Sequence, residues 1–262
     1  MKHAFAESPL LPLIDATPIT IDRDEVEIIP ASPTKGGKVP SYLSDYRKRL
    51  RHRLLTGGAK AMPNYEILEL TLFRIIPRQD VKPFARRLID TFGDLNAVLA
   101  APIARLESVE GVETAVALEL KVMETITHRM ARAKIMQRHV ISSWDAVLDY
   151  CHTVMAHRDT EQFRVLYLDR KNVLIADEEQ GSGTVDHVPV YPREVVKRAL
   201  ELNASSMILV HNHPSGDPSP SQEGIDMTKQ VANAAQALNI TLHDHLIIGR
   251  SRELSFKSQG LI

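Results

Sequence analysis

Near residue 140 the hydrophobic pattern of this chain changes from helical repeats alone to a mixture of helices and strands, and this change constrains the fold more than any other feature. From Tyr42 to about Arg138 the apolar residues recur at helical spacing, as in "YEILELTLFRII", where Leu68 and Leu72 lie on one stripe. One more amphipathic helix, "ISSWDAVLDYCHTVMA", follows, and the apolar residues then adopt the shorter period of strands. The pattern predicts a helical segment followed by an α+β segment.

The α+β segment is expected to contain a hairpin, two helices and closing strands. The predicted strands are residues 163–169, 173–178, 206–213, 240–249 and 253–260. The predicted helices are residues 193–204 and 221–238. The fold class of this segment is therefore α+β.

The length of 262 residues suits two ordinary domains. Residues 1–40 hold six of the fifteen prolines and show no sustained period, which predicts a disordered tail. We therefore expect three parts: a disordered tail at 1–40, a helical domain at 41–138 and an α+β domain at 139–262.

Neither a membrane span nor a secretory signal is expected. No segment approaches roughly 18 uninterrupted apolar residues, and prolines and acidic residues interrupt the apolar groups near the N-terminus. The single cysteine, Cys151, cannot form an internal disulfide, which agrees with a reducing compartment. Its helical spacing with Val147 and Leu148 favours a buried small side chain over a nucleophile. The expected location is the cytoplasm, without membrane association.

The net charge of -1 conceals an uneven distribution. Residues 41–140 contain 17 basic and 11 acidic residues, whereas residues 141–262 contain 11 basic and 16 acidic residues. The helical segment is therefore the part that favours an anionic partner. Its basic patch, "YRKRLRHR" at 46–53, is interpreted as a solvated helix face, with phosphate contact as the alternative.

Two histidines, His211 and His213, end the apolar run Met207–Val210. Residues i and i+2 of a strand point to the same face, so the two imidazoles project side by side, an arrangement that suits zinc. Pro214 helps to end the strand, and Ser221 is the expected N-cap of the next helix. Paired histidines at a strand end also fit surface or hydrogen-bonded imidazoles, so the pair alone leaves both interpretations open.

The surrounding sequence resembles the RadC family of bacterial proteins, whose C-terminal domain is a JAMM (MPN-type) zinc metallopeptidase fold. The resemblance rests on "VPVYPREVVKRALELNASSMILVHNHPSGDPSPS", preceded by "LIADE" and followed by "HDHLIIG". It covers roughly residues 41–262 and is specific in the last hundred. It implies a JAMM/MPN-like mixed sheet flanked by helices, zinc as cofactor, and peptidase or isopeptidase activity on a protein or peptide substrate.

The JAMM pattern consists of an upstream Glu, then H-x-H-P, a loop, and S-x-x-D. The resemblance assigns these roles: His211 and His213 as metal ligands, Glu178 as general acid/base, and Ser221 as the serine that stabilises the oxyanion. Glu179 competes with Glu178, because both faces of that strand carry apolar residues and alternation cannot choose between them.

The aspartate of the pattern falls on Gly224, so the third protein ligand is missing. Glu223 and Asp226 are rotated by about 100° and about 200° from position 224 on a helix, while Asp217 lies in the loop. Whether one of these carboxylates replaces the aspartate stays open. Low zinc occupancy is expected, and a lapsed enzyme acting as a protein-binding module is the alternative function.

A second H-x-H pair, His243 and His245 in "TLHDHLIIG", matches a strand motif of the family. We interpret these two side chains as structural imidazoles, with a rival metal site as the alternative.

The helical segment resembles the helix-hairpin-helix module of RadC relatives, which offers backbone N–H groups to nucleic-acid phosphate. In its turn, "SVEGVET", Gly111 and Val112 match, but Glu113 replaces the second glycine and Glu110 precedes the first. These carboxylates would repel phosphate, so only weak DNA binding is expected. Packing between domains is the other interpretation of the module, and a DNA-associated repair factor is a further alternative function.

Overall fold

The computed structural model describes residues 40–182 and 190–262, which belong to one compact unit. The disordered tail predicted for residues 1–40 lies outside the described residues, except for Pro40. Among the described residues, no helix is both long enough and apolar enough to cross a membrane.

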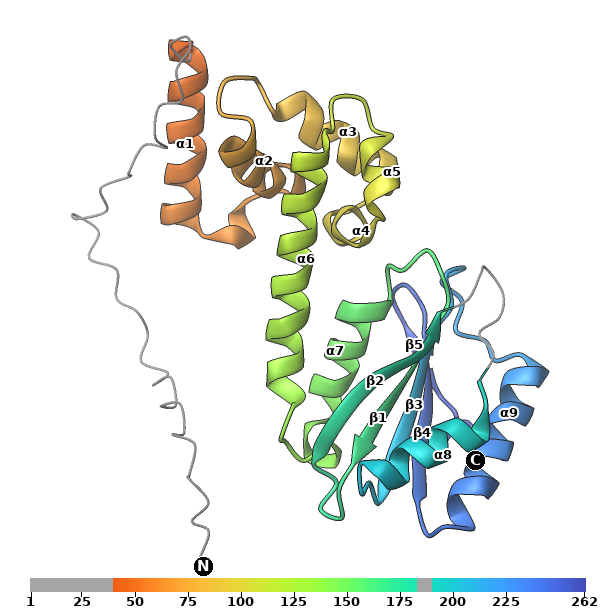
Figure 1. Cartoon of the computed structure of the whole chain (residues 1–262). Coiled ribbons are helices and arrows are strands. Elements are labelled where there is room, and N and C mark those ends of the chain that lie inside the picture. Colours follow the sequence, from red (N-terminus) through yellow and green to blue (C-terminus); the bar gives the residue numbers. More distant parts are fainter. Residues whose placement is uncertain (1–39, 183–189) are drawn as a thin grey trace, which may run out of the picture. The chain divides into compact units, whose positions relative to one another are not determined.

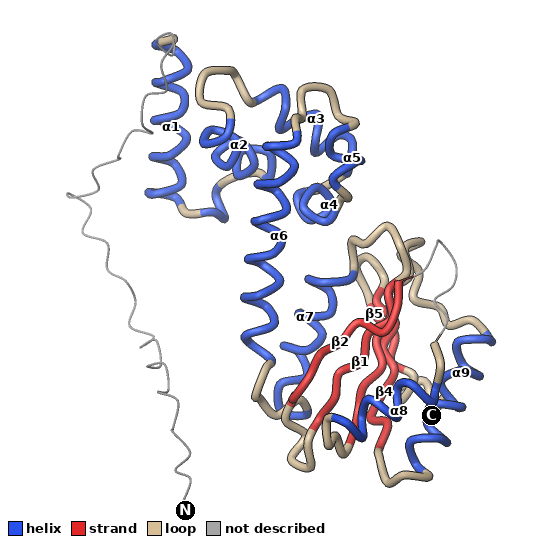
Figure 2. The backbone as a smooth tube through the Cα atoms, viewed as in Figure 1, coloured by secondary structure: helices blue, strands red, loops and turns tan. Residues whose placement is uncertain are grey.

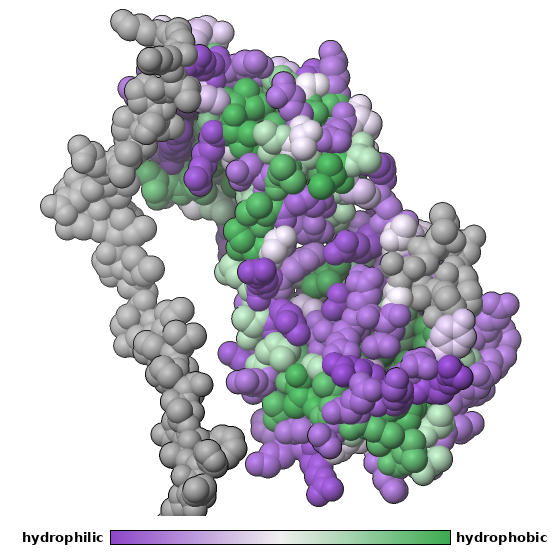
Figure 3. All heavy atoms as spheres, viewed as in Figure 1, coloured by the Kyte–Doolittle hydropathy of each residue, from purple (hydrophilic) through white to green (hydrophobic). Residues whose placement is uncertain are grey.

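The first half of the described chain is helical, as predicted (Figure 1). Its helices are α1 (Ser41–Gly57), α2 (Asn64–Ile75), α3 (Lys82–Phe92), α4 (Leu95–Ala100), α5 (Ile103–Glu107) and α6 (Thr114–Ile135), with a 3-10 turn at Ala59–Ala61. They enclose one hydrophobic core that includes Leu68, Leu72, Leu88, Leu106 and Leu120. Apolar side chains also remain on the surface of α6, where Leu118, Val122, Ile126 and Met130 follow one another at intervals of four residues (Figure 3).

The basic patch on α1 is not uniformly solvated, which corrects the interpretation from sequence. Arg47 is only 7% exposed and donates hydrogen bonds of 2.6–2.8 Å to the carbonyls of Ile76, Pro77 and Gln79. These carbonyls lie in the irregular segment between α2 and α3, where no helical or strand backbone pairing provides hydrogen-bond donors for them. Because Arg47 supplies the missing donors, it is a structural residue of the helical core.

The turn between α5 and α6 requires glycine at position 111. Gly111 has a φ of 85°, and a Cβ added there would come 2.1 Å from Cε1 of Phe84 on α3. Neither the backbone conformation nor the space tolerates a side chain. The described geometry thus gives Gly111 a packing role, while the weak DNA binding inferred from this turn stays a prediction.

The second half is a mixed five-stranded sheet with helices on both faces (Figures 1 and 2). Its strands are β1 (Gln162–Leu168), β2 (Leu174–Ser182), β3 (Ser206–Asn212), β4 (Thr241–Ile248) and β5 (Glu253–Ser255). Their order is β2-β1-β3-β4-β5, in which β3 and β4 are parallel and the other neighbours are antiparallel. The predicted α+β class is confirmed. The predicted last strand is too long, because Leu261 donates to the carbonyl of Phe256 and closes a turn there.

Each face of the sheet has its own core. Helix α7 (Trp144–Met155) covers one face, where it packs against Leu166, Val210 and Leu246. Helices α8 (Pro192–Glu201) and α9 (Gln222–Gln236) cover the other face, which carries Phe163, Val165 and Leu209. Cys151, on the buried side of α7, is fully buried, as predicted, and burial raises the pKa of its thiol to about 12.

Candidate metal centre

The two histidines of the H-x-H motif lie at the end of the central strand β3. His211 is paired with Phe163 of β1 on one side and with Ile247 of β4 on the other, so its backbone is held from both directions. The Nε2 atoms of His211 and His213 lie 3.0 Å apart. His211 is buried and His213 is half-buried. The expectation that both imidazoles project together is met.

A carboxylate that sequence reasoning missed lies beside them. Glu161, His211 and His213 each offer a ligand atom, and all three atoms lie within 4.8 Å of one another. Glu161 immediately precedes β1, two residues before Phe163, and Phe163 is the β1 partner of His211. Residues two apart in an extended chain point to the same face, so the pairing of β1 with β3 delivers Glu161 to the histidines. The local sequence pattern does not predict that β1 pairs with β3, so it could not indicate this contact.

Glu178, the residue assigned as general acid/base, contacts neither histidine. It lies on β2 opposite Val165, and its carboxylate accepts hydrogen bonds of 2.7 and 2.8 Å from the guanidinium of Arg198 on α8. These bonds lower the pKa of the Glu178 carboxyl. A carboxylate held in an ion pair is a weaker base, and the role of Glu178 as general acid/base stays a prediction. Its competitor Glu179 is exposed.

Ser221 is the N-cap of α9, as expected from sequence. Its Oγ accepts a 3.0 Å hydrogen bond from the backbone N–H of Gly224, which leaves the hydroxyl proton available for another acceptor. The assigned role of Ser221 in oxyanion stabilisation stays a prediction.

The three carboxylates considered as replacements for an acid at position 224 are placed elsewhere. Asp217 is paired with Arg252 at 3.2 Å, and Asp226 accepts a 3.0 Å hydrogen bond from Gln222. Glu223 is exposed in the first turn of α9. Among the described residues, the carboxylate that groups with the two histidines is Glu161.

The outer ring nitrogens of both histidines have partners. Nδ1 of His213 lies 2.7 Å from the carbonyl oxygen of Asp217, and Nδ1 of His211 lies 2.8 Å from Nε2 of His245. Nδ1 of His245 lies in turn 2.6 Å from the hydroxyl of Thr228 on α9. His245, from the second H-x-H pair, thus contacts the candidate site from behind. The other member of that pair, His243, contacts Asn172 at 2.6 Å.

Burial keeps the inner imidazoles neutral. Desolvation, and then the neighbouring histidines, hold the pKa of His211 well below its usual range. Desolvation also lowers the pKa of His245 to about 3. A neutral imidazole offers a lone pair to a metal, and a partner on its other nitrogen orients it. The imidazoles of His211 and His213 and the carboxylate of Glu161 form a donor set that fits Zn²⁺.

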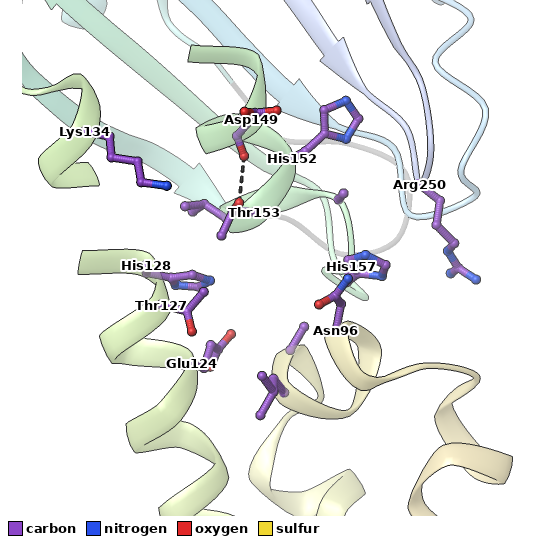
Figure 4. Close-up of a pocket in the computed structure, with 14 residues that line it drawn as sticks. Asn96, Glu124, Thr127, His128, Lys134, Asp149, His152, Thr153, His157 and Arg250 are labelled. Atoms are coloured by element: carbon purple, nitrogen blue, oxygen red, sulfur yellow. Dashed lines mark hydrogen bonds between the residues drawn. The ribbon is translucent and has the colours of Figure 1, made fainter. Parts of the chain in front are cut away.

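A separate cavity of about 530 Å³ lies between α4, α6 and α7 (Figure 4). Glu124 and His128 of α6 line one side, His152 and His157 lie across from them, and Arg250 lies at the margin. None of the candidate metal ligands lines this cavity. The sequence did not point to it.

The sheet with helices on both faces and the histidine pair at the end of β3 define a JAB-type (MPN-type) domain. The model of the RadC-like JAB domain family matches residues 141–261. A UPF0758 protein of Ruegeria pomeroyi is 71% identical over 224 residues, which are 86% of this chain and 100% of that protein. A UPF0758 protein of Rhodobacter capsulatus is 69% identical over 213 residues, which are 81% of this chain and 100% of that protein. The chain belongs to the RadC family.

Proposed function

We propose that this protein is a zinc-dependent amide hydrolase of the JAMM type, a peptidase or isopeptidase, with His211 and His213 as metal ligands. The observation that carries the proposal is the convergence of their Nε2 atoms to 3.0 Å, with the Glu161 carboxylate in the same group of donors. The family membership supports it, because the JAB fold is compatible with a metallohydrolase.

Each residue of the site has a distinct task in this proposal. Zinc would polarise the substrate carbonyl and lower the pKa of a water molecule. Glu161 would take the proton from that water and pass it to the leaving amine. The Ser221 hydroxyl, whose proton is not used by the helix cap, would donate to the carbonyl oxygen as negative charge develops there.

Glycine at position 224 favours a second candidate function, a metal-binding or protein-binding module without turnover. With Gly224 in place, Glu161 is the carboxylate that the described residues bring to the histidines. If Glu161 completes a His2Glu coordination set, no carboxylate is left in that group to act as base. The hydrolase requires that Glu161 stays outside the coordination sphere or moves between the two roles.

Replacement of Glu161 separates these two functions. We would measure zinc per chain by elemental analysis, and cleavage of a proteome-derived peptide mixture by mass spectrometry, for the reconstituted protein and for Glu161→Gln. The hydrolase predicts a variant that keeps zinc and loses cleavage. Loss of zinc from the variant, with no cleavage by the parent protein, would support the module. Failure of the parent protein to take up zinc would refute the hydrolase and the metal-binding module, and would leave a protein-binding module without metal.

We propose a protein or peptide as the partner, in the cytoplasm, and at most weak binding of DNA. The carboxylates Glu110 and Glu113 beside the hairpin turn, and the internal hydrogen bonds of Arg47, weigh against a nucleic-acid surface there.

A further inference from the structure

We propose that His245 and Thr228 are positioning residues that decide which ring nitrogen of His211 carries its proton, and thereby whether His211 can bind a metal. The inference rests on the proposed metal site. It arises from a continuous line of hydrogen-bonding groups, which we call the histidine relay. The relay runs through Gly224, Thr228, His245, His211 and His213.

The elements that carry the relay are packed tightly. His245 lies on β4 next to β3, and Thr228 lies on α9, which covers the same face of the sheet. Both residues are fully buried. Water therefore has no access to complete a missing hydrogen bond, and each contact in the relay must be satisfied by the protein itself.

One arrangement of protons leaves His211 ready for a metal. The Thr228 hydroxyl donates to the carbonyl of Gly224 at 2.6 Å and accepts from Nδ1–H of His245. Nε2 of His245 then accepts from Nδ1–H of His211. In this arrangement Nε2 of His211 carries a lone pair. His213, whose Nδ1–H donates to a backbone carbonyl, also presents a lone pair at Nε2.

The reverse arrangement closes the site. The Thr228 hydroxyl donates to Nδ1 of His245, and Nε2–H of His245 donates to Nδ1 of His211. Nε2–H of His211 then donates to Nε2 of His213 across 3.0 Å. Every donor again has an acceptor, but Nε2 of His211 is protonated and has no lone pair to offer to a metal.

The two arrangements hold the same number of protons, because each neutral imidazole and the hydroxyl carry one in both. Which arrangement forms therefore depends on whether a proton or a cation lies between the two Nε2 atoms. Without a cation, two lone pairs 3.0 Å apart repel each other, and the reverse arrangement replaces this repulsion with a hydrogen bond. A cation between the same atoms favours the first arrangement.

This assignment gives position 224 a function despite its lack of a carboxylate. The carbonyl of Gly224 is the acceptor to which the Thr228 hydroxyl turns when His211 binds a metal. The hydroxyl is the only part of Thr228 that the relay uses, so Thr228→Val removes the relay contact and keeps the side-chain shape. Thr228→Ser keeps the hydroxyl.

The first test is metal affinity of the full chain, measured by competition with a zinc chelator. We expect Thr228→Val to weaken zinc binding by about 10- to 100-fold, as for other groups that orient a metal-bound histidine, while Thr228→Ser stays close to the parent protein. The matched control is Thr125→Val on α6, where the hydroxyl also bonds the carbonyl four residues back but contacts no histidine. Equal zinc affinity of Thr228→Val, Thr125→Val and the parent protein would overturn the inference.

The second test determines which ring nitrogen of each histidine is protonated, from the ¹⁵N chemical shifts of the rings. Variants in which one histidine at a time is replaced assign the signals. We expect His211 to be protonated at Nε2 in the metal-free protein and at Nδ1 after zinc is added. Protonation of His211 at Nδ1 in the metal-free protein would contradict the relay. If the parent protein took up no zinc, the proposed function would fail, but the metal-free spectrum would still decide the relay.

Discussion

Glu178 on β2 and Arg198 on α8 are joined by two hydrogen bonds, of 2.7 and 2.8 Å, on the face of the sheet that also carries His211. The two carboxylates on this face thus have different surroundings: Glu178 lies against a guanidinium, and Glu161 lies against two imidazoles. Strand pairing therefore brings Glu161 to the histidines, while the role of Glu178 as general acid/base stays a prediction.

The first prediction concerns Glu178→Gln. We expect zinc content and any hydrolysis to stay close to those of the parent protein, because the Glu178 carboxylate bonds Arg198 and not the histidines. Glu161→Gln is the matched comparison, since it makes the same chemical change at the site. Zinc content by elemental analysis and hydrolysis by the peptide-cleavage assay are compared for the two variants. Loss of cleavage in Glu178→Gln with unchanged folding would restore the role assigned from the sequence pattern.

The second prediction concerns Gly224→Asp. An added Cβ would meet the Ser221 hydroxyl at 3.3 Å, a contact that a small shift of that side chain relieves. We expect higher zinc affinity from the restored carboxylate. We also expect higher stability, because glycine costs roughly 1 kcal/mol in a helix and an acid near a helix N-terminus is favourable.

The control for this change is Gly224→Ala, which supplies the helix propensity without the carboxylate. It should raise the thermal midpoint but leave zinc affinity unchanged. Equal zinc affinity in Gly224→Asp, Gly224→Ala and the parent protein would mean that position 224 does not face the metal.

The third prediction concerns pH. Burial lowers the pKa of His211 and His245, the latter to about 3, so the unfolded chain binds protons more readily than the folded chain below the ordinary histidine pKa of about 6.5. The free energy of unfolding of the metal-free protein should therefore fall as pH drops from about 6.5 towards 3. Each group adds at most about 1.4 kcal/mol per pH unit.

Chemical denaturation at several pH values measures this dependence. The variant His245→Asn should flatten the curve, whereas a change at the exposed residue His52, His52→Gln, should leave its slope unchanged. A slope that is the same in both variants would argue against burial of His245 as the cause.

The fourth prediction concerns Arg47. Its guanidinium supplies donors to three carbonyls after α2, so Arg47→Met should destabilise the helical half by about 2–4 kcal/mol, as expected when buried carbonyls lose a charged donor. The neighbouring Arg49 is exposed, and Arg49→Met is the control with little expected change. Thermal unfolding followed by circular dichroism measures both. For this reason, a test of DNA binding by the basic patch must leave Arg47 in place.

Several features of this protein follow from local sequence, because they depend only on neighbours along the chain. The change of period near residue 140 predicted the helical half and the α+β half. The spacing of His211 and His213 predicted that both imidazoles share a face, since side chains alternate along any strand. Ser221 was recognisable as an N-cap, because its hydroxyl bonds a backbone N–H three residues away.

Other features depend on contacts between residues far apart in sequence, and only the tertiary structure decided them. Glu161 reaches the histidines because β1 pairs antiparallel with β3, fifty residues away. Glu178 is paired with Arg198 because α8 packs on the same face of the sheet. His245 and Thr228 become partners of His211 only when β4 and α9 pack on the same face. Periodicity shows which face of an element is buried, but the choice of its neighbour comes from the packing of the whole domain.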